Sequence, residues 1–266
     1  MKLIIFLIIV LSTAIQSANA AAVFCIPKAS AALSGLKQIA LVPGTGGATF
    51  FDRKIQSMLC ELGYKVALID SDIDYKNFDI DFGVHDRYVN IFLGTLQTAL
   101  QESPEPTAII GSSLGGIFAS IAFAKNEELF QGLLQSAIII SAGGSLAEVI
   151  EASELAQLKK LRNQRRQHYS DMNDAEITSK LKEAITLDPH ELANGEKRKS
   201  VLMYISQFDK VVPTVMQAAL WNAWGQPEVR KIPLAHISTI AFVLLARIKE
   251  ISSFIQNQST LCKKLF

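Results

Sequence analysis

Short apolar runs alternate with amphipathic stretches along most of the chain. The runs are rich in Ile, Val, Leu and Ala at consecutive positions, which is typical of strands buried on both faces of a parallel sheet. The stretches between them carry apolar residues at helical spacing. The predicted strands are residues 38–42, 65–69, 107–110, 136–141, 201–205 and 229–232. The predicted helices are residues 50–62, 84–100, 117–125, 213–224 and 237–256.

This alternation predicts an α/β fold with helices on both faces of a mostly parallel sheet of about six strands. Residues 21–37 are short and of mixed polarity and show no clear element. Only about 17 residues of the expected mature chain precede residue 38, and we expect a minimal sheet without an antiparallel edge strand. Residues 71–83 are acidic and aromatic and are predicted to form a loop at the carboxyl edge of the sheet.

Residues 145–200 depart from the alternation, because they contain no predicted strand. Residues 145–167 and 175–185 are predicted helices, and the segment follows a strand, so it is expected to lie over the carboxyl edge of the sheet as a helical cap. A helix with an apolar stripe must bury it, either against the body of the domain or over a substrate pocket. The stripe consists of Leu146, Val149, Ile150, Leu155, Leu158 and Leu161.

Residues 1–20 have the pattern of a secretory signal peptide. Lys2 supplies the positive charge, residues 3–11 are an unbroken apolar run, and Ala18-Asn19-Ala20 is an A-x-A cleavage site. The apolar run is shorter than the roughly 18–20 residues that a membrane-spanning helix needs, which favours cleavage over an uncleaved membrane anchor. We expect a periplasmic or secreted protein whose mature chain, residues 21–266, has no transmembrane span.

The composition narrows the classes of partner. The 266-residue chain has 26 basic and 25 acidic side chains, and Lys2 lies in the segment expected to be removed, so the mature chain is formally neutral. This balance argues against a nucleic-acid partner. The length suits one α/β domain or two small ones. Cys25, Cys60 and Cys262 allow one disulfide without indicating which pair forms. No cysteine has metal-ligand spacing and the four histidines are scattered, so no metal is expected.

A serine lies at the apex of a sharp predicted turn. The strand 107–110 leads into Gly111-Ser112-Ser113-Leu114-Gly115, and a predicted helix follows. Gly111 and Gly115 remove Cβ atoms that would clash in so tight a turn. An ordinary strand-to-helix turn can show the same short pattern, but the flanking strand and helix favour a nucleophile elbow. Ser113 is therefore the candidate nucleophile.

A serine hydroxyl needs a base within hydrogen-bond reach, and the base needs an orienting carboxylate. Asp209 follows the predicted strand 201–205, and His236 follows the predicted strand 229–232. Each lies just past the carboxyl end of a strand, as Ser113 does. These ends share one edge of a parallel sheet, so the three side chains are expected to converge.

Other residues compete for these roles. Asp188 is an alternative acid, but it lies in the insertion rather than at the end of a strand. His85, His168 and His190 are alternative bases and are expected at the surface, because the first opens a predicted helix and the other two lie in the insertion.

At these positions the sequence resembles the α/β-hydrolase superfamily, over roughly residues 37–256. The marks are the elbow, the Asp209-x-x-Val-Pro context and a histidine just before the last predicted helix, in the chain order Ser, Asp, His. The resemblance implies that Ser113 is the nucleophile, that His236 is the general base and then the general acid, and that Asp209 orients His236.

The resemblance also implies an oxyanion hole made of two backbone N–H groups. One belongs to Leu114, which follows the nucleophile. The other comes from the glycine-rich loop Pro43-Gly44-Thr45-Gly46-Gly47, which looks like the Pro-Gly-Thr-Gly loop of some lipases, so the role falls to Thr45. The loop lacks the Gly-Lys-Ser/Thr ending of a P-loop and the full spacing of a dinucleotide fingerprint, so no nucleotide cofactor is expected.

The expected function is that of an exported serine hydrolase that cleaves small-molecule or lipid-like carboxylic esters through an acyl-serine intermediate, without a cofactor. Thioesterase and peptidase activity would use the same three residues. A non-catalytic binding protein on the same fold is a further alternative, since fold and activity are separable.

Overall fold

The structure is a computed structural model that describes residues 21–27, 36–45, 47–70 and 80–262. The predicted signal peptide, residues 1–20, and most of the predicted loop 71–83 lie outside the described residues.

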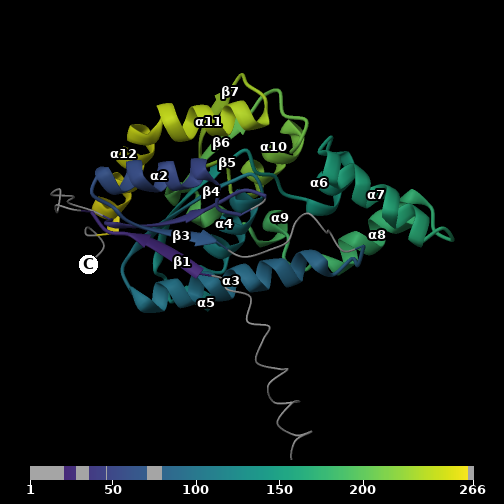
Figure 1. Cartoon of the computed structure of the whole chain (residues 1–266), viewed down its shortest axis with the longest axis horizontal. Coiled ribbons are helices and arrows are strands. Elements are labelled where there is room, and N and C mark those ends of the chain that lie inside the picture. Colours follow the sequence, from purple (N-terminus) through teal and green to yellow (C-terminus); the bar gives the residue numbers. More distant parts are fainter. Residues whose placement is uncertain (1–20, 28–35, 46, 71–79, 263–266) are drawn as a thin grey trace, which may run out of the picture.

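A seven-stranded sheet in the order β1-β3-β2-β4-β5-β6-β7 forms the centre of the fold (Figure 1). The strands from β2 to β7 are parallel, as the apolar runs predict. The strands are β1 (Ala21–Cys25), β2 (Gln38–Val42), β3 (Lys65–Asp70), β4 (Thr107–Ser112), β5 (Leu134–Ile140), β6 (Val201–Ser206) and β7 (Glu228–Ile232).

The β1 strand corrects one prediction. It runs antiparallel to β3, with Ala21 opposite Asp70 and Cys25 opposite Val66, so the expectation of a sheet without an antiparallel edge strand is wrong. A disulfide joins Cys25 to Cys60 in helix α2 (Phe50–Glu61), which decides the pairing that the sequence left open. The edge strand is thus held by its backbone hydrogen bonds to β3, by the disulfide and by a hydrogen bond from Gln56 of α2 to the carbonyl oxygen of Val23.

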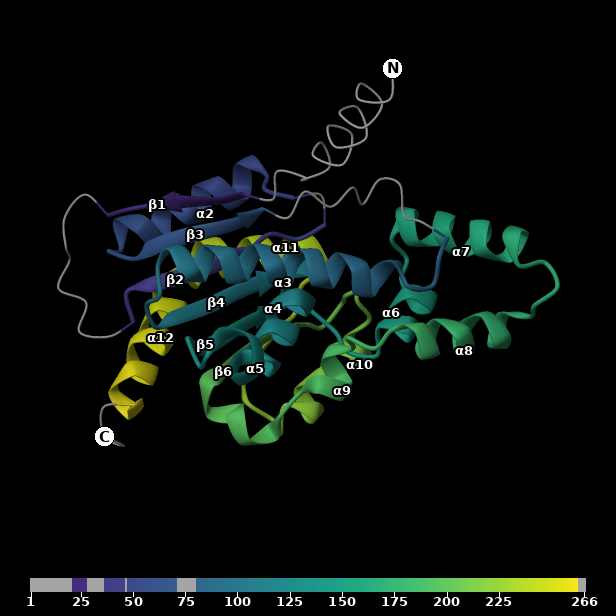
Figure 2. The same cartoon turned by 90° about the horizontal axis from the view of Figure 1, so that it is seen from below.

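Helices cover both faces of the sheet, as predicted (Figure 1, Figure 2). One core forms between the sheet and α3, α4 and α10, with Phe92 and Phe118 among its largest side chains. The other core forms between the opposite face and α2, α11 and α12 and includes Ile55 and Val243. The further helices are α3 (Val84–Glu102), α4 (Leu114–Ala124), α5 (Asn126–Phe130), α10 (Thr214–Ala223), α11 (His236–Ala246) and α12 (Ile248–Cys262).

Two predicted helices differ from the observed ones. Residues 115–123 of α4 are all buried, so this helix is apolar on every side rather than amphipathic. It packs on β4 and β5 in the centre of the sheet, where no side of it faces water. The last predicted helix is divided into α11 and α12 at Arg247.

The insertion 145–200 contains helices and no strand, and all of it lies in the described part of the chain. Figure 2 shows α6, α7 and α8 beyond the ends of the strands, at one end of the molecule. The predicted helix 145–167 is interrupted at residues 153–155. The elements are α6 (Leu146–Ala152), α7 (Ala156–His168), α8 (Asp174–Ala184), α9 (Pro189–Leu192) and the 3-10 helix η2 (Gly195–Ser200).

None of the helices in the described ranges is long and apolar enough to cross a membrane.

Candidate active site

The turn between β4 and α4 holds Ser113 in a rare backbone conformation, with φ of 55° and ψ of −126°. A non-glycine residue keeps such a conformation only where its surroundings enforce it. A Cβ atom on Gly111 would collide with the carbonyl oxygen of Gly115, and one on Gly115 would collide with the carbonyl oxygen of Pro43. Both glycines are therefore required for the turn, as the sequence predicts.

The structure brings the three predicted residues together. Nε2 of His236 lies 2.9 Å from Oγ of Ser113, and Nδ1 of His236 lies 2.6 Å from Oδ2 of Asp209. An ionised carboxylate only accepts, so Nδ1 carries the proton that is donated to Asp209. Nε2 then has a free lone pair that faces the hydroxyl of Ser113. The side chains of His236 and Asp209 are 5% and 0% exposed, so the hydrogen bond between them is shielded from water.

Asp209 is fixed from several sides. Its Oδ1 accepts the backbone N–H groups of Val211 at 2.8 Å and Val212 at 2.9 Å. Its Oδ2 accepts from Nε2 of Gln217 at 2.9 Å. Gln217 is buried in α10 and also accepts the backbone N–H of Ser206 at 3.0 Å, so it links the acid to the end of β6.

The sequence did not indicate that Gln217 would hold Asp209 in place. A glutamine one turn into a helix carries no pattern that marks it, and its role depends on the distance between α10 and the end of β6.

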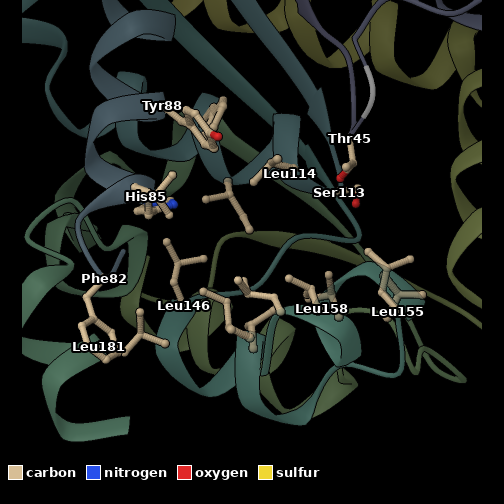
Figure 3. Close-up of a pocket in the computed structure, with 18 of the residues that line it drawn as sticks. Thr45, Phe82, His85, Tyr88, Ser113, Leu114, Leu146, Leu155, Leu158 and Leu181 are labelled. Atoms are coloured by element: carbon tan, nitrogen blue, oxygen red, sulfur yellow. The ribbon is translucent and has the colours of Figure 1, made fainter. Parts of the chain in front are cut away.

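The predicted oxyanion-hole residues lie beside Ser113. Leu114 is the first residue of α4, where a backbone N–H has no acceptor within the helix. Thr45 lines the same cavity as Ser113, and Figure 3 shows the two side by side. The loop is fastened at its end because Oδ1 of Asp70 accepts the backbone N–H of Ala48 at 3.1 Å. Gly46 lies outside the described residues.

The alternative acid has a different role. Oδ1 of Asp188 accepts the backbone N–H groups of Ser145 at 3.1 Å and His190 at 2.8 Å, and its Oδ2 accepts that of Leu146 at 2.6 Å. Asp188 therefore ties the start of α9 to the start of α6. It bonds to no histidine ring among the described residues.

The alternative bases do not contact Ser113. His168 is exposed beside Tyr169, and His190 lies 3.2 Å from Glu191. The expectation that His85 lies at the surface is wrong. The residue is 9% exposed, because the start of α3 lies beneath the insertion, and Nε2 of His85 lies 3.3 Å from the carbonyl oxygen of Leu187.

An apolar cavity of about 90 Å³ adjoins Ser113 beneath the insertion (Figure 3). All six residues of the predicted apolar stripe line it, together with side chains of α3 and α4. The stripe therefore faces the cavity beside the serine, with Leu146, Val149 and Leu161 buried and the other three residues partly buried. The remaining wall includes Phe82, Val84, His85, Tyr88, Ile117, Phe118, Arg165, Leu181 and Val212.

A second, wider groove of about 470 Å³ reaches Ser113 from another side. It passes His236 and is bordered by Thr49, Asp52 and Gln157, so its lining is more polar than that of the cavity. Ser113 thus lies where an apolar cavity meets a wider groove whose lining is less apolar.

Within the ranges that the structure describes, no group of three or more His, Cys, Asp and Glu side chains is arranged to hold a metal ion.

No family model matches the sequence, and no curated protein matches it. Solved structures do. Est1E from Butyrivibrio proteoclasticus superposes with a TM-score of 0.60 at 15% identity, covering 89% of this chain and 93% of Est1E. Another structure of Est1E contains ferulic acid. The acetyl xylan esterase from Paenibacillus sp. R4 has a TM-score of 0.60 at 16% identity, covering 85% of this chain and 78% of the esterase.

The chain has an α/β-hydrolase fold.

The acylaminoacyl peptidase of Pyrococcus horikoshii shares this α/β-hydrolase fold, with a TM-score of 0.61 at 14% identity over 89% of this chain. The match covers 39% of the peptidase, so the chain spans about two fifths of that protein's length. At these identities the likeness concerns the α/β-hydrolase fold alone, and the chemistry has to be argued from the site.

Proposed function

We propose that the protein is a serine hydrolase that cleaves carboxylic esters through an acyl-serine intermediate. The observation that carries the proposal is the chain of hydrogen bonds from Ser113 through His236 to Asp209. It supplies a nucleophile, a base and an orienting carboxylate in the order that acyl transfer requires.

The geometry supports a two-step reaction. Ser113 Oγ attacks the acyl carbon while Nε2 of His236 takes the hydroxyl proton, and Asp209 stabilises the imidazolium that results. His236 then gives the proton to the departing alkoxide, which leaves as the alcohol. A water molecule attacks the acyl-serine with His236 again as base, and the carboxylic acid and free Ser113 are released.

The negative charge of each tetrahedral intermediate needs donors in place beforehand. The backbone N–H of Leu114 and that of Thr45 are the proposed donors, because both residues adjoin Ser113. Removal of one such donor typically costs about 3–4 kcal/mol of transition-state stabilisation.

The two spaces that meet at Ser113 suggest where each half of the ester binds. The apolar cavity beneath the insertion suits a hydrocarbon acyl group, and the open groove suits a more polar alcohol and gives it a route out. One of the similar structures is named as an acetyl xylan esterase, and xylan is a polar partner of this kind. This assignment makes residues 145–200 a cap that shapes the acyl pocket.

We also infer that the protein is exported and that its mature chain begins at Ala21. The disulfide between Cys25 and Cys60 supports export, because such bonds persist in oxidising compartments and are rare in the cytosol.

A fluorophosphonate probe and a panel of 4-nitrophenyl esters test the proposal. Wild-type protein should be labelled and should hydrolyse the esters, and Ser113→Ala should abolish both. Ser113→Ala, His236→Ala and the double variant should lose similar activity, because residues that act as one unit do not contribute additively. Additive losses, or an unlabelled folded protein, would contradict the proposal, and faster cleavage of thioesters or amides would shift it to those substrates.

A further inference from the structure

One titratable side chain in the cavity has no part in the proposed reaction. His85 is the second residue of α3 and is buried, and Figure 3 shows it across the cavity from Ser113. The leucines of the insertion form the wall between these two positions. A polar ring at the far end of an apolar cavity is a feature that packing alone does not require.

The hydrogen bonds of His85 leave one ring nitrogen available. The carbonyl oxygen of Leu187 can only accept, so Nε2 carries the proton that it donates over 3.3 Å, and Nδ1 keeps its lone pair. No side chain or backbone group in the described residues bonds to Nδ1. His85 lines the cavity, so Nδ1 is the ring nitrogen left to meet a bound molecule there.

Burial keeps this lone pair available at neutral pH. The loss of hydration lowers the pKa of His85 below its usual value, against smaller opposing effects of the Leu187 carbonyl, Asp86 and Asp188. The ring is therefore neutral at pH 7, and Nδ1 acts as an acceptor.

Arg165 also lines the cavity, but its guanidinium can only donate, and it donates to the backbone carbonyl oxygens of Ile80 and Asp81.

We propose that the acyl group of the substrate carries a hydroxyl at its far end, which donates a hydrogen bond to Nδ1 of His85. The inference rests on the proposed function and adds the chemical class of the acid: a hydroxyphenylalkanoic or hydroxyalkanoic acid. The hydrocarbon between carbonyl and hydroxyl lies against the leucines of the cap. The hydrogen bond from Nε2 to Leu187 holds the His85 ring in place, and Nδ1 binds the substrate hydroxyl.

Matched pairs of esters test this inference. The 4-nitrophenyl esters of 3-phenylpropanoic acid and of its 2-, 3- and 4-hydroxyphenyl analogues form the aromatic arm, and hexanoate and 6-hydroxyhexanoate form the aliphatic arm. For at least one hydroxylated ester, kcat/KM should exceed that of its plain partner by roughly 10- to 100-fold, because the plain ester leaves a buried acceptor without a donor. The arm that shows the preference tells whether the hydroxyl is carried by a ring or a chain.

The variant His85→Phe keeps a ring in place and removes the acceptor, so the ratio of the two kcat/KM values should fall to about one. His168→Phe is the matched control, because His168 is exposed and does not line the cavity, and it should keep the wild-type ratio. The ratio is read within each variant, so a general loss of activity does not imitate the effect.

A wild-type ratio near one in both arms would overturn the inference, whether or not His85→Phe folds. A preference that survives in His85→Phe would assign the recognition to another group and overturn it as well. If no ester of either kind is hydrolysed, the proposed function itself fails. Hydrolysis with no preference for the hydroxylated esters contradicts only the role of His85 and leaves the proposed function standing.

Discussion

Replacing Asp209 by asparagine tests the proposed catalytic order most directly. Oδ1 of Asp209 accepts two backbone N–H groups, which favours the carbonyl oxygen of an asparagine at that position. The amide NH2 then takes the place of Oδ2 and points its protons at Gln217 and His236, both of which donate to Oδ2 in the native protein. His236 can accept from this amide only by moving its own proton to Nε2. The proton then faces Ser113, and the base is lost.

The size of the effect follows from this change of tautomer. A histidine whose proton faces the nucleophile cannot take the hydroxyl proton, and in an analogous triad the same substitution lowers kcat by about 10⁴-fold. We expect a similar loss for Asp209→Asn, which corresponds to about 5.5 kcal/mol of activation free energy. The side-chain volume is unchanged, so the overall fold should persist.

Release of 4-nitrophenolate from a 4-nitrophenyl ester measures kcat, and thermal unfolding checks the fold. Asp188→Asn is the matched control: it makes the same chemical change at an acid that ties α9 to α6, and it should lower stability by about 1–3 kcal/mol while kcat stays within about tenfold. If Asp209→Asn keeps kcat within tenfold of wild type while Asp188→Asn loses a thousandfold, the acid has been assigned to the wrong residue.

Three further predictions concern the cap, the disulfide and export. Alanine at Leu146, Val149 or Ile150 should change the preference among acyl chain lengths, at about 1–3 kcal/mol per methylene, while labelling by a small fluorophosphonate changes much less; lower stability with a flat chain-length profile would make the insertion purely structural. Cys25→Ser should lower the free energy of unfolding in urea by about 4 kcal/mol, since the bond closes a loop across a sequence separation of 35 residues; an unchanged midpoint would refute this. Mass spectrometry of the exported protein should show Ala21 as the first residue, and an intact Met1 would indicate an anchor instead.

The parallel strands β2 to β6 were predictable because each contains a continuous apolar run of a length that a sheet covered on both faces can bury, whereas β7 is Glu-Val-Arg-Lys-Ile and only its last residue is buried. The meeting of Ser113, Asp209 and His236 followed from the alternation of strands and helices, since each residue lies just past the carboxyl end of a predicted strand. Both inferences depend on local sequence and on one property of parallel sheets, which is why they agree with the geometry.

The features that escaped prediction depend on contacts between distant segments. The strand β1 is five residues long and pairs with a strand about 45 residues further along the chain, which no local pattern reveals. The burial of His85 follows from the position of the insertion over the start of α3. Gln217 contacts Asp209 only because the loop after β6 turns back toward α10.

The position of His236 next to an edge strand has a consequence for how the protein would lose activity on heating. The nucleophile elbow follows β4, which has partners on both sides, whereas His236 follows β7, the last strand in the sheet order. Strands at an edge open locally at a lower free-energy cost than those at the centre. Opening of β7 and the start of α11 would carry the base away from an otherwise intact elbow. Inactivation should therefore begin below the temperature of global unfolding and reverse on cooling. The loss of hydrolysis rate on heating would then measure the local opening of the β7 edge of the sheet.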